Sequence, residues 1–138
     1  MKCRTLAKYM TTNPHSIGFD QSLRSAAAMM DKHRIRHLPV LNGNHVIGIL
    51  TDRDLKFALS MKDVDAESVK VEDICKEEVY IATPNSMLEE VVQNMATKKI
   101  GSALIMDNHK LVGIFTSIDA LNALVDLLNK REHGSCGH

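Results

Sequence analysis

A seven-residue pattern occurs twice in this 138-residue chain and limits its fold more than any other feature of the sequence. Residues 48–54 read GILTDRD, and residues 113–119 read GIFTSID. The copies stand 65 positions apart, which pairs their glycines, threonines and aspartates: Gly48 with Gly113, Thr51 with Thr116, and Asp54 with Asp119. A pattern repeated at a fixed offset indicates a duplicated structural unit.

The same offset holds for most of the chain. Apolar residues spaced i, i+3, i+4 and i+7 predict an amphipathic helix in each copy: Leu23, Ala26, Ala27 and Met30, then Leu88, Val91, Val92 and Met95. Short apolar runs on either side of residues 42–44 and 107–109 predict two hairpins, the first with an Asn-Gly turn. The match departs from this offset only between residues 14–20 and residues 79–85, where we expect the two copies to be shifted by one position.

Each copy therefore predicts a lead-in, a strand, a helix, a hairpin of two strands and a second helix. We expect a first repeat with its lead-in over residues 1–62, a polar linker over 63–70, a second repeat over 71–129 and a flexible tail over 130–138. The tail reads HGSCGH from residue 133, and its composition favours a frayed end over a metal site.

Composition places the chain among ordinary soluble proteins. No apolar run approaches the roughly 20 residues of a membrane helix, and the N-terminal MKCRTLAKYM lacks the apolar core of a secretory signal, so we expect a cytoplasmic protein without a membrane partner. Cys3, Cys75 and Cys136 include no closely spaced pair, which argues against a disulfide framework and a structural zinc site.

The charge distribution argues against nucleic-acid binding. Residues 1–65 hold ten Lys/Arg and six Asp/Glu, a net charge of +4, whereas residues 66–138 hold seven and eleven, a net charge of −4. Nucleic-acid proteins carry a concentrated basic surface and often aromatic stacking residues. This chain has two Tyr, three Phe and no Trp.

The residues alone leave two interpretations of the repeated Thr and Asp. A Thr after a strand is a natural helix N-cap, and an acidic residue three positions later resembles a capping box. Capping boxes prefer Glu or Gln, however, because Asp is too short to reach back easily. A Thr hydroxyl at a helix N-terminus can also hold a phosphate, and a carboxylate can accept both hydroxyls of a ribose. Helix cap and nucleotide site therefore both remain open.

The ordered, duplicated pattern resembles a tandem pair of CBS domains, named for cystathionine β-synthase. The resemblance runs from about Leu6 to about Leu128 and departs from the usual Pro-Val at Leu104-Ile105. It implies a mixed α/β (α+β) fold, with two β-α-β-β-α repeats packed around a pseudo-twofold axis and two clefts between them. In many members those clefts bind AMP, ADP, ATP or S-adenosylmethionine.

The resemblance also implies which residues bind. The Thr and Asp of each turn would contact the ribose, apolar residues of the first strand would contact the adenine, and the segment before the hairpin would face the phosphate. The candidate ligand-binding residues are Ile17, Arg36, His37, Thr51, Arg53 and Asp54 in the first copy, and Ile81, Ser102, Thr116 and Asp119 in the second. Basic residues accompany only the first copy, so we expect two unequal sites.

We expect a regulatory nucleotide sensor without catalysis, catalytic cofactor or metal. The alternative is a ligand-free assembly or interaction scaffold in which the turns are only caps. An enzyme is the weakest interpretation, because the sequence offers no nucleophile–base pair, no P-loop lysine motif and no metal-ligand cluster. The sequence does not identify the protein partner that such a module would regulate.

The last predicted helix carries more apolar residues than one repeat needs to cover its own sheet: Ile118, Leu121, Leu124, Val125 and Leu128. Apolar stripes of this kind mark interfaces. Together with the resemblance, the stripe predicts a homodimer that forms a flat disk of four repeats. Opposite charges on the two halves favour a head-to-tail arrangement weakly.

Overall fold

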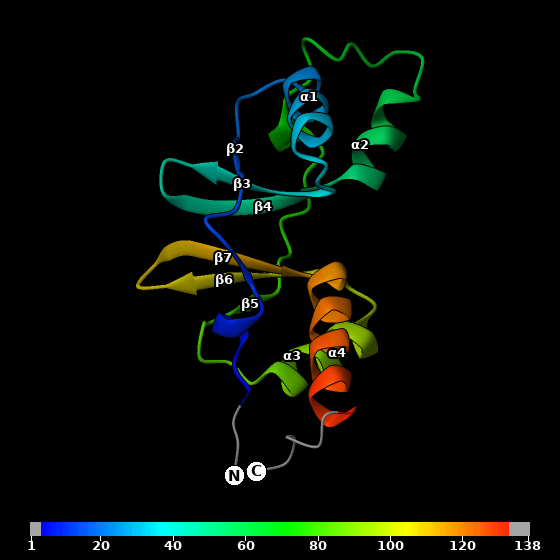
Figure 1. Cartoon of the computed structure of the whole chain (residues 1–138). Helices are drawn as coiled ribbons and strands as arrows, with labels where there is room; N and C mark the ends of the chain where they lie inside the picture. Colours follow the sequence, from blue (N-terminus) through cyan, green and yellow to red (C-terminus); the bar gives the residue numbers. More distant parts are fainter. Residues whose placement is uncertain (1–3, 133–138) are drawn as a thin grey trace. The chain divides into compact units, whose positions relative to one another are not determined.

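The computed structural model describes residues 4–132, and its elements follow in the order that the duplication predicts (Figure 1). The helices are η1 (Leu6–Lys8), α1 (Leu23–His33), α2 (Asp52–Leu59), η2 (Val71–Asp73), α3 (Leu88–Lys98) and α4 (Ser117–Glu132). The strands are β1 (Thr11–Thr12), β2 (Ile17–Gly18), β3 (His37–Asn42), β4 (His45–Thr51), β5 (Ile81–Ala82), β6 (Ser102–Asp107) and β7 (Lys110–Thr116).

The chain divides into two compact units. The first unit, which holds the first turn, spans His15–Val79, and the second unit combines residues 4–14 with residues 80–132. Helix α4 ends at Glu132, so it continues into the segment predicted as a tail, and residues 133–138 lie outside the described residues, as does Cys3. Among residues 4–132, no helix has the length and apolar character needed to cross a membrane.

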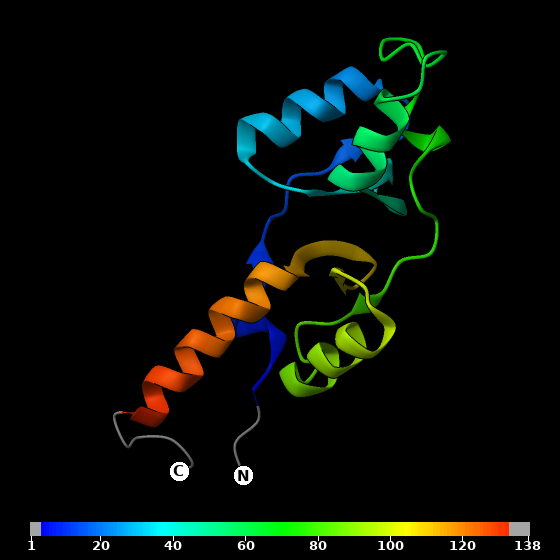
Figure 2. The same ribbon diagram turned by 90° about the vertical axis from the view of Figure 1, so that its right-hand side faces the viewer.

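The first unit is a three-stranded sheet in the order β2-β3-β4, with α1 and α2 on the same face (Figures 1 and 2). Strand β2 runs parallel to β3, which requires a crossover, and α1 supplies it. The hairpin from β3 to β4 turns through Gly43 at φ 62°, a conformation that favours glycine.

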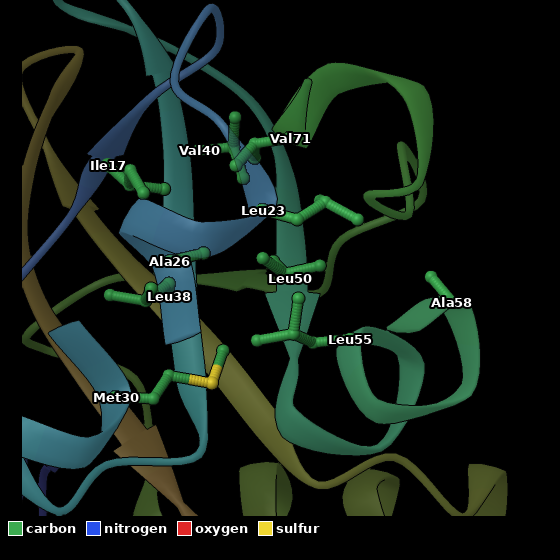
Figure 3. Packing of buried hydrophobic residues seen from close by; sticks show 10 residues of the cluster. All are labelled: Ile17, Leu23, Ala26, Met30, Leu38, Val40, Leu50, Leu55, Ala58 and Val71. Atoms are coloured by element: carbon green, nitrogen blue, oxygen red, sulfur yellow. The ribbon is translucent and has the colours of Figure 1, made fainter. Parts of the chain in front are cut away.

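The apolar stripes predicted from the sequence form the core of this unit. Leu23, Ala26 and Met30 of α1 pack with Leu55 and Ala58 of α2 over the sheet (Figure 3). The remaining members shown are Ile17, Leu38, Val40, Leu50 and Val71. Burial of these side chains fixes α2 against the sheet, and thereby fixes the turn from which α2 starts.

The second unit repeats this arrangement with one further strand, in the order β1-β7-β6-β5. Its core contains Leu6, Ala82, Leu88, Val91, Met95, Ala103, Ile105, Phe115 and Ala123. Ile17 pairs with Val40, and Ala82 pairs with Ile105. Because both pairs keep the 65-residue offset, the one-position slip predicted around these strands is wrong, and Ala82 rather than Ile81 is the counterpart of Ile17.

Each lead-in joins the unit built from the other copy. Strand β1, in the first lead-in, pairs with β7: Thr11 lies opposite Ile114. Lys76, in the second lead-in, pairs with Ile49 of β4 through two backbone hydrogen bonds of 2.9 Å. Thr11 and Lys76 are 65 positions apart, so the same place in the two units holds a hydroxyl in one and an ammonium in the other.

The close approach of the lead-in explains the glycine of the repeated pattern. A Cβ atom at Gly48 would stand 2.5 Å from the Lys76 carbonyl oxygen and 2.9 Å from the Cys75 sulfur. A Cβ atom at Gly113 would stand 2.7 Å from the Met10 sulfur and 3.0 Å from the Thr11 carbonyl oxygen. Glycine is therefore the residue that lets the lead-in backbone lie against β4 and β7.

We expect Gly48→Ala to destabilise the protein by about 1–3 kcal/mol, the usual cost of overpacking, because its methyl group would meet a backbone atom. Gly113→Ala should cost less, since the nearest atom belongs to a flexible methionine side chain that can move. Urea denaturation of both variants measures the difference. Equal losses of stability in the two variants would show that the nearby Lys76 carbonyl oxygen is not the reason why position 48 excludes a side chain.

Candidate functional site

The first turn connects β4 to α2 and places Thr51 and Asp54 together. Thr51 is the N-cap of α2, and its hydroxyl accepts a hydrogen bond of 3.1 Å from the Asp54 amide. The amide of Asp52, the first residue of α2, donates to the Arg36 carbonyl oxygen at 2.8 Å. The helix start is thus tied to the segment that precedes β3, where the basic candidates lie.

His37 lies opposite Thr51 in the β3–β4 ladder. Burial lowers the pKa of this imidazole, the neighbouring Arg36 guanidinium lowers it further, and Asp52 opposes them. A lowered pKa leaves the ring neutral at pH 7, because the ordinary value of about 6.5 is already below 7. His37 can therefore exchange hydrogen bonds with a ligand but adds no positive charge.

The positive charge beside this turn comes from Arg36 and Arg53. Both side chains are exposed, and neither forms an ion pair with another of residues 4–132. Asp52, the acid that could have paired with them, instead contacts Lys56 at 3.2 Å. Both guanidinium groups are thus available to an anionic ligand.

The lowered pKa of His37 predicts an acid-sensitive fold. Below the unfolded-state pKa of about 6.5, the unfolded chain binds a proton at His37 that the folded protein resists. Stability should therefore be full above that pH and fall as the pH drops toward the folded-state pKa. Urea denaturation between pH 7.5 and pH 5.5 measures this fall, which His37→Gln should reduce. His45→Gln, at an exposed position of β4, is the control, and equal slopes in both variants would contradict the assignment.

The second turn connects β7 to α4 and is capped in both directions. The Asp119 amide donates to the Thr116 hydroxyl at 3.4 Å, and the Thr116 amide donates to Asp119 Oδ2 at 2.9 Å. This reciprocal pair is a capping box. The expectation that Asp is too short to reach back is therefore wrong at Asp119, where the backbone of the turn brings the carboxylate close enough. At the first turn, only the Thr51 half of the box forms.

The surroundings of the second turn carry no charge at the matching positions. Ser102 lies opposite Thr116, and Gly101 accepts a hydrogen bond from the Ser117 amide at 3.1 Å, the counterpart of the Arg36–Asp52 contact. Ile118, in the place of Arg53, is exposed. The two turns therefore have the same backbone arrangement but differ in the charge of the side chains around them.

Sequence reasoning missed two residues that contact the aspartates. Thr11 Oγ1 donates to Asp119 Oδ1 at 3.1 Å, and Lys76 Nζ lies 3.6 Å from Asp54 Oδ2. The second contact is an ion pair that is too long for a hydrogen bond. Asp54 Oδ2 is shielded from solvent and accepts no hydrogen bond from residues 4–132. The 65-residue offset matches residues 6–10 with residues 71–75 in the lead-ins, and the next pair along the chain is Thr11 and Lys76, so extending the match by one residue would have found both.

The two apolar candidates lie in different surroundings. Ile17 is 3% exposed and belongs to the core, whereas Ile81 is 45% exposed. Ile81 thus offers a surface to a ligand, and the Ile17 side chain offers almost none. Among residues 4–132, no group of three or more His, Cys, Asp and Glu side chains is arranged to hold a metal ion.

Two segments of the chain, residues 6–61 and 71–126, each match the CBS domain family. The chain belongs to the CBS domain family. The CBS domain-containing protein YhcV of Bacillus subtilis is 31% identical over 105 residues, which cover 76% of this chain and 74% of YhcV. Inosine-5′-monophosphate dehydrogenase of Staphylococcus aureus is 30% identical over 129 residues, or 89% of this chain, but the match spans only 25% of that enzyme.

Solved structures confirm the CBS-pair fold. A Vibrio cholerae protein assigned to acetoin utilization (AcuB) superposes with a TM-score of 0.86 at 27% identity, covering 96% of this chain and 98% of its own. The CBS domain pair of protein MJ0100, in complex with 5′-methylthioadenosine and S-adenosyl-L-methionine, gives a TM-score of 0.78 at 25% identity, covering 88% and 99%. The mixed α/β fold with two sheets and four α-helices among the described residues is the one expected.

Proposed function

We propose that this CBS pair is a regulatory module that binds an adenosine-containing ligand at the first turn and does no chemistry on it. One observation carries the proposal: the Asp54 carboxylate has an oxygen that accepts no hydrogen bond from residues 4–132. A buried acceptor without a donor is unfavourable, and the two hydroxyls of a ribose are donors suited to it. Arg36 and Arg53, whose side chains are exposed beside the same turn, would contact the phosphate of that ligand.

The ligand preference follows from the charges. A hydrogen bond from Arg to a phosphate contributes about 1.5–3 kcal/mol, or roughly a factor of ten or more in affinity. The first turn therefore favours AMP, ADP or ATP. The second turn, with Ser102 and Ile118 at the matching positions, binds weakly or takes a less anionic ligand such as S-adenosylmethionine. The relative MJ0100, which holds S-adenosyl-L-methionine, supports adenosine ligands in such a pair.

A thermal melt with a panel of adenosine compounds tests this function. A ligand that binds only the folded protein raises the melting temperature by mass action, and a concentration 100 times the dissociation constant adds about 2.7 kcal/mol. We expect AMP, ADP or ATP at millimolar concentration to raise the melting temperature, with guanosine phosphates as the control. No rise with any adenosine compound would favour a ligand-free scaffold.

The second turn gives the scaffold alternative its support. Asp119 accepts hydrogen bonds from the Thr116 amide and from the Thr11 hydroxyl, so this carboxylate already stabilises the start of α4. A module that binds at one turn and uses the other only as a helix cap combines both functions. Assembly with a regulated protein would then respond to the occupancy of the first turn.

We further propose a homodimer that forms through the α4 stripe, which consists of Ile118, Leu121, Leu124, Val125 and Leu128. All five side chains are at least half exposed. The counterpart helix α2 exposes Phe57 and Leu59, so both helices that follow the turns present apolar surface. Such surface on a soluble chain marks an interface, and a disk of four repeats in a head-to-tail arrangement would bring the oppositely charged halves together.

A further inference from the structure

The lead-in residue that faces each aspartate differs between the units in a way that bears on ligand choice. Thr11 and Lys76 hold the same place, opposite Ile114 of β7 and Ile49 of β4. The backbone position is therefore common to both units. The side chain alone decides which group meets the carboxylate.

In the second unit, neutral donors satisfy the carboxylate. Asp119 Oδ1 accepts from Thr11 Oγ1 at 3.1 Å, and Asp119 Oδ2 accepts from the Thr116 amide at 2.9 Å and from the Thr116 hydroxyl at 3.3 Å. A ribose hydroxyl that displaced the Thr11 hydroxyl would replace it with a group of the same kind.

In the first unit, a cation stands in that place. Lys76 Nζ lies 3.6 Å from Asp54 Oδ2, which accepts no hydrogen bond from the described residues. The Lys76 side chain is 64% exposed and that of Asp54 is 28% exposed, so the ammonium can swing into solvent while the carboxylate stays in the turn. Lysine has a long flexible stem and three rotatable donors, which suits such a movement.

We propose that Lys76 makes the first turn selective for phosphorylated nucleosides. Without ligand, its ammonium compensates the Asp54 charge. When ribose hydroxyls donate to Asp54, the ammonium loses its close approach to the carboxylate and needs a new anionic partner. A phosphate on the bound nucleoside supplies that partner, whereas an unphosphorylated nucleoside supplies none. This inference rests on the proposed function, and it assigns a specificity role to a residue from the second lead-in.

The test compares AMP with adenosine by titration calorimetry. All proteins in this comparison carry Asp119→Ala, so that the titration measures binding at the first turn alone. The background protein should bind AMP more tightly than adenosine. Lys76→Thr, which installs the residue type found at the same place in the second unit, should reduce the ratio of the two affinities by about tenfold. Most of the loss should fall on AMP, and adenosine binding should be unchanged or tighter.

Two controls separate this role from general effects of charge and folding. Lys62→Thr removes the same charge at an exposed position between α2 and η2, and should leave the ratio unchanged. Lys76→Arg keeps the charge and should keep the preference for AMP. An equal loss of both affinities in Lys76→Thr, or an unchanged ratio, would overturn the role of Lys76 while leaving the proposed function intact. If neither compound bound the wild-type chain, that result would refute both the proposed function and this inference.

Discussion

Asp54→Ala should weaken AMP binding at least tenfold, whereas Asp119→Ala should change it little. The Asp54 carboxylate is the one with an unsatisfied oxygen, and hydrogen bonds to a charged group contribute about 1.5–3 kcal/mol each. Loss of even one such bond from a ribose hydroxyl accounts for the tenfold effect. Calorimetric titration of the two variants with AMP measures the difference.

The same two variants should show the opposite order in stability. Asp119→Ala removes the acceptor of the Thr116 amide and of the Thr11 hydroxyl, and loss of a helix cap costs about 0.5–2 kcal/mol. Asp54→Ala removes an acceptor that no backbone amide uses, so its cost should be smaller. Equal losses of AMP affinity in both variants would refute the asymmetry between the turns. If neither variant lost affinity, both turns would be helix caps only.

Leu121→Asp should split the proposed homodimer. Leu121 is 57% exposed at the centre of the α4 stripe, and burying a leucine fully contributes about 1.5–3 kcal/mol. A symmetric interface contains each residue twice, and only the exposed part of Leu121 is left to bury, so the change removes about 2–3 kcal/mol before the cost of burying a charge is added. The dissociation constant of the dimer should rise more than a hundredfold, which sedimentation at micromolar concentration detects.

Asn122→Asp provides the matched control, because it adds the same charge to an exposed position of α4 outside the stripe. The control should remain dimeric. The Leu121→Asp monomer should keep the far-ultraviolet circular dichroism of the wild type, since the side chain lies outside the core of its unit. A wild-type chain that is monomeric at micromolar concentration would show that the stripe serves another purpose.

The fold was predictable from periodicity because each helix and hairpin carries a local signal. The stripe of Leu23, Ala26 and Met30 and the turn at Gly43 specify their elements without reference to the rest of the chain. Periodicity shows which residues are duplicated, but it does not show which copy they pair with. The crossing of the lead-ins, which brings Thr11 to β7 and Lys76 to β4, is a tertiary pairing and left no local signal.

The candidate site was predictable to a similar extent. The residue types at Thr51 and Asp54 indicated a helix start that can bind a ribose, and the ladder does place His37 opposite Thr51. The hydrogen bonds that each carboxylate accepts depend on the backbone of the turn and on the lead-in, so the sequence could not distinguish Asp54, whose Oδ2 accepts none from residues 4–132, from the capped Asp119. The roles of the ten predicted binding residues stay predictions until a ligand is bound.

The most direct test of the central claim, that the first turn binds an adenosine nucleotide, is a titration of the ¹⁵N-labelled chain with AMP followed by amide chemical shifts. The account predicts saturable shifts centred on the amides of Thr51, Arg53 and Asp54 and on Lys76, with smaller changes at Thr116 and Asp119. Shifts confined to the second turn, or none at millimolar AMP, would contradict it.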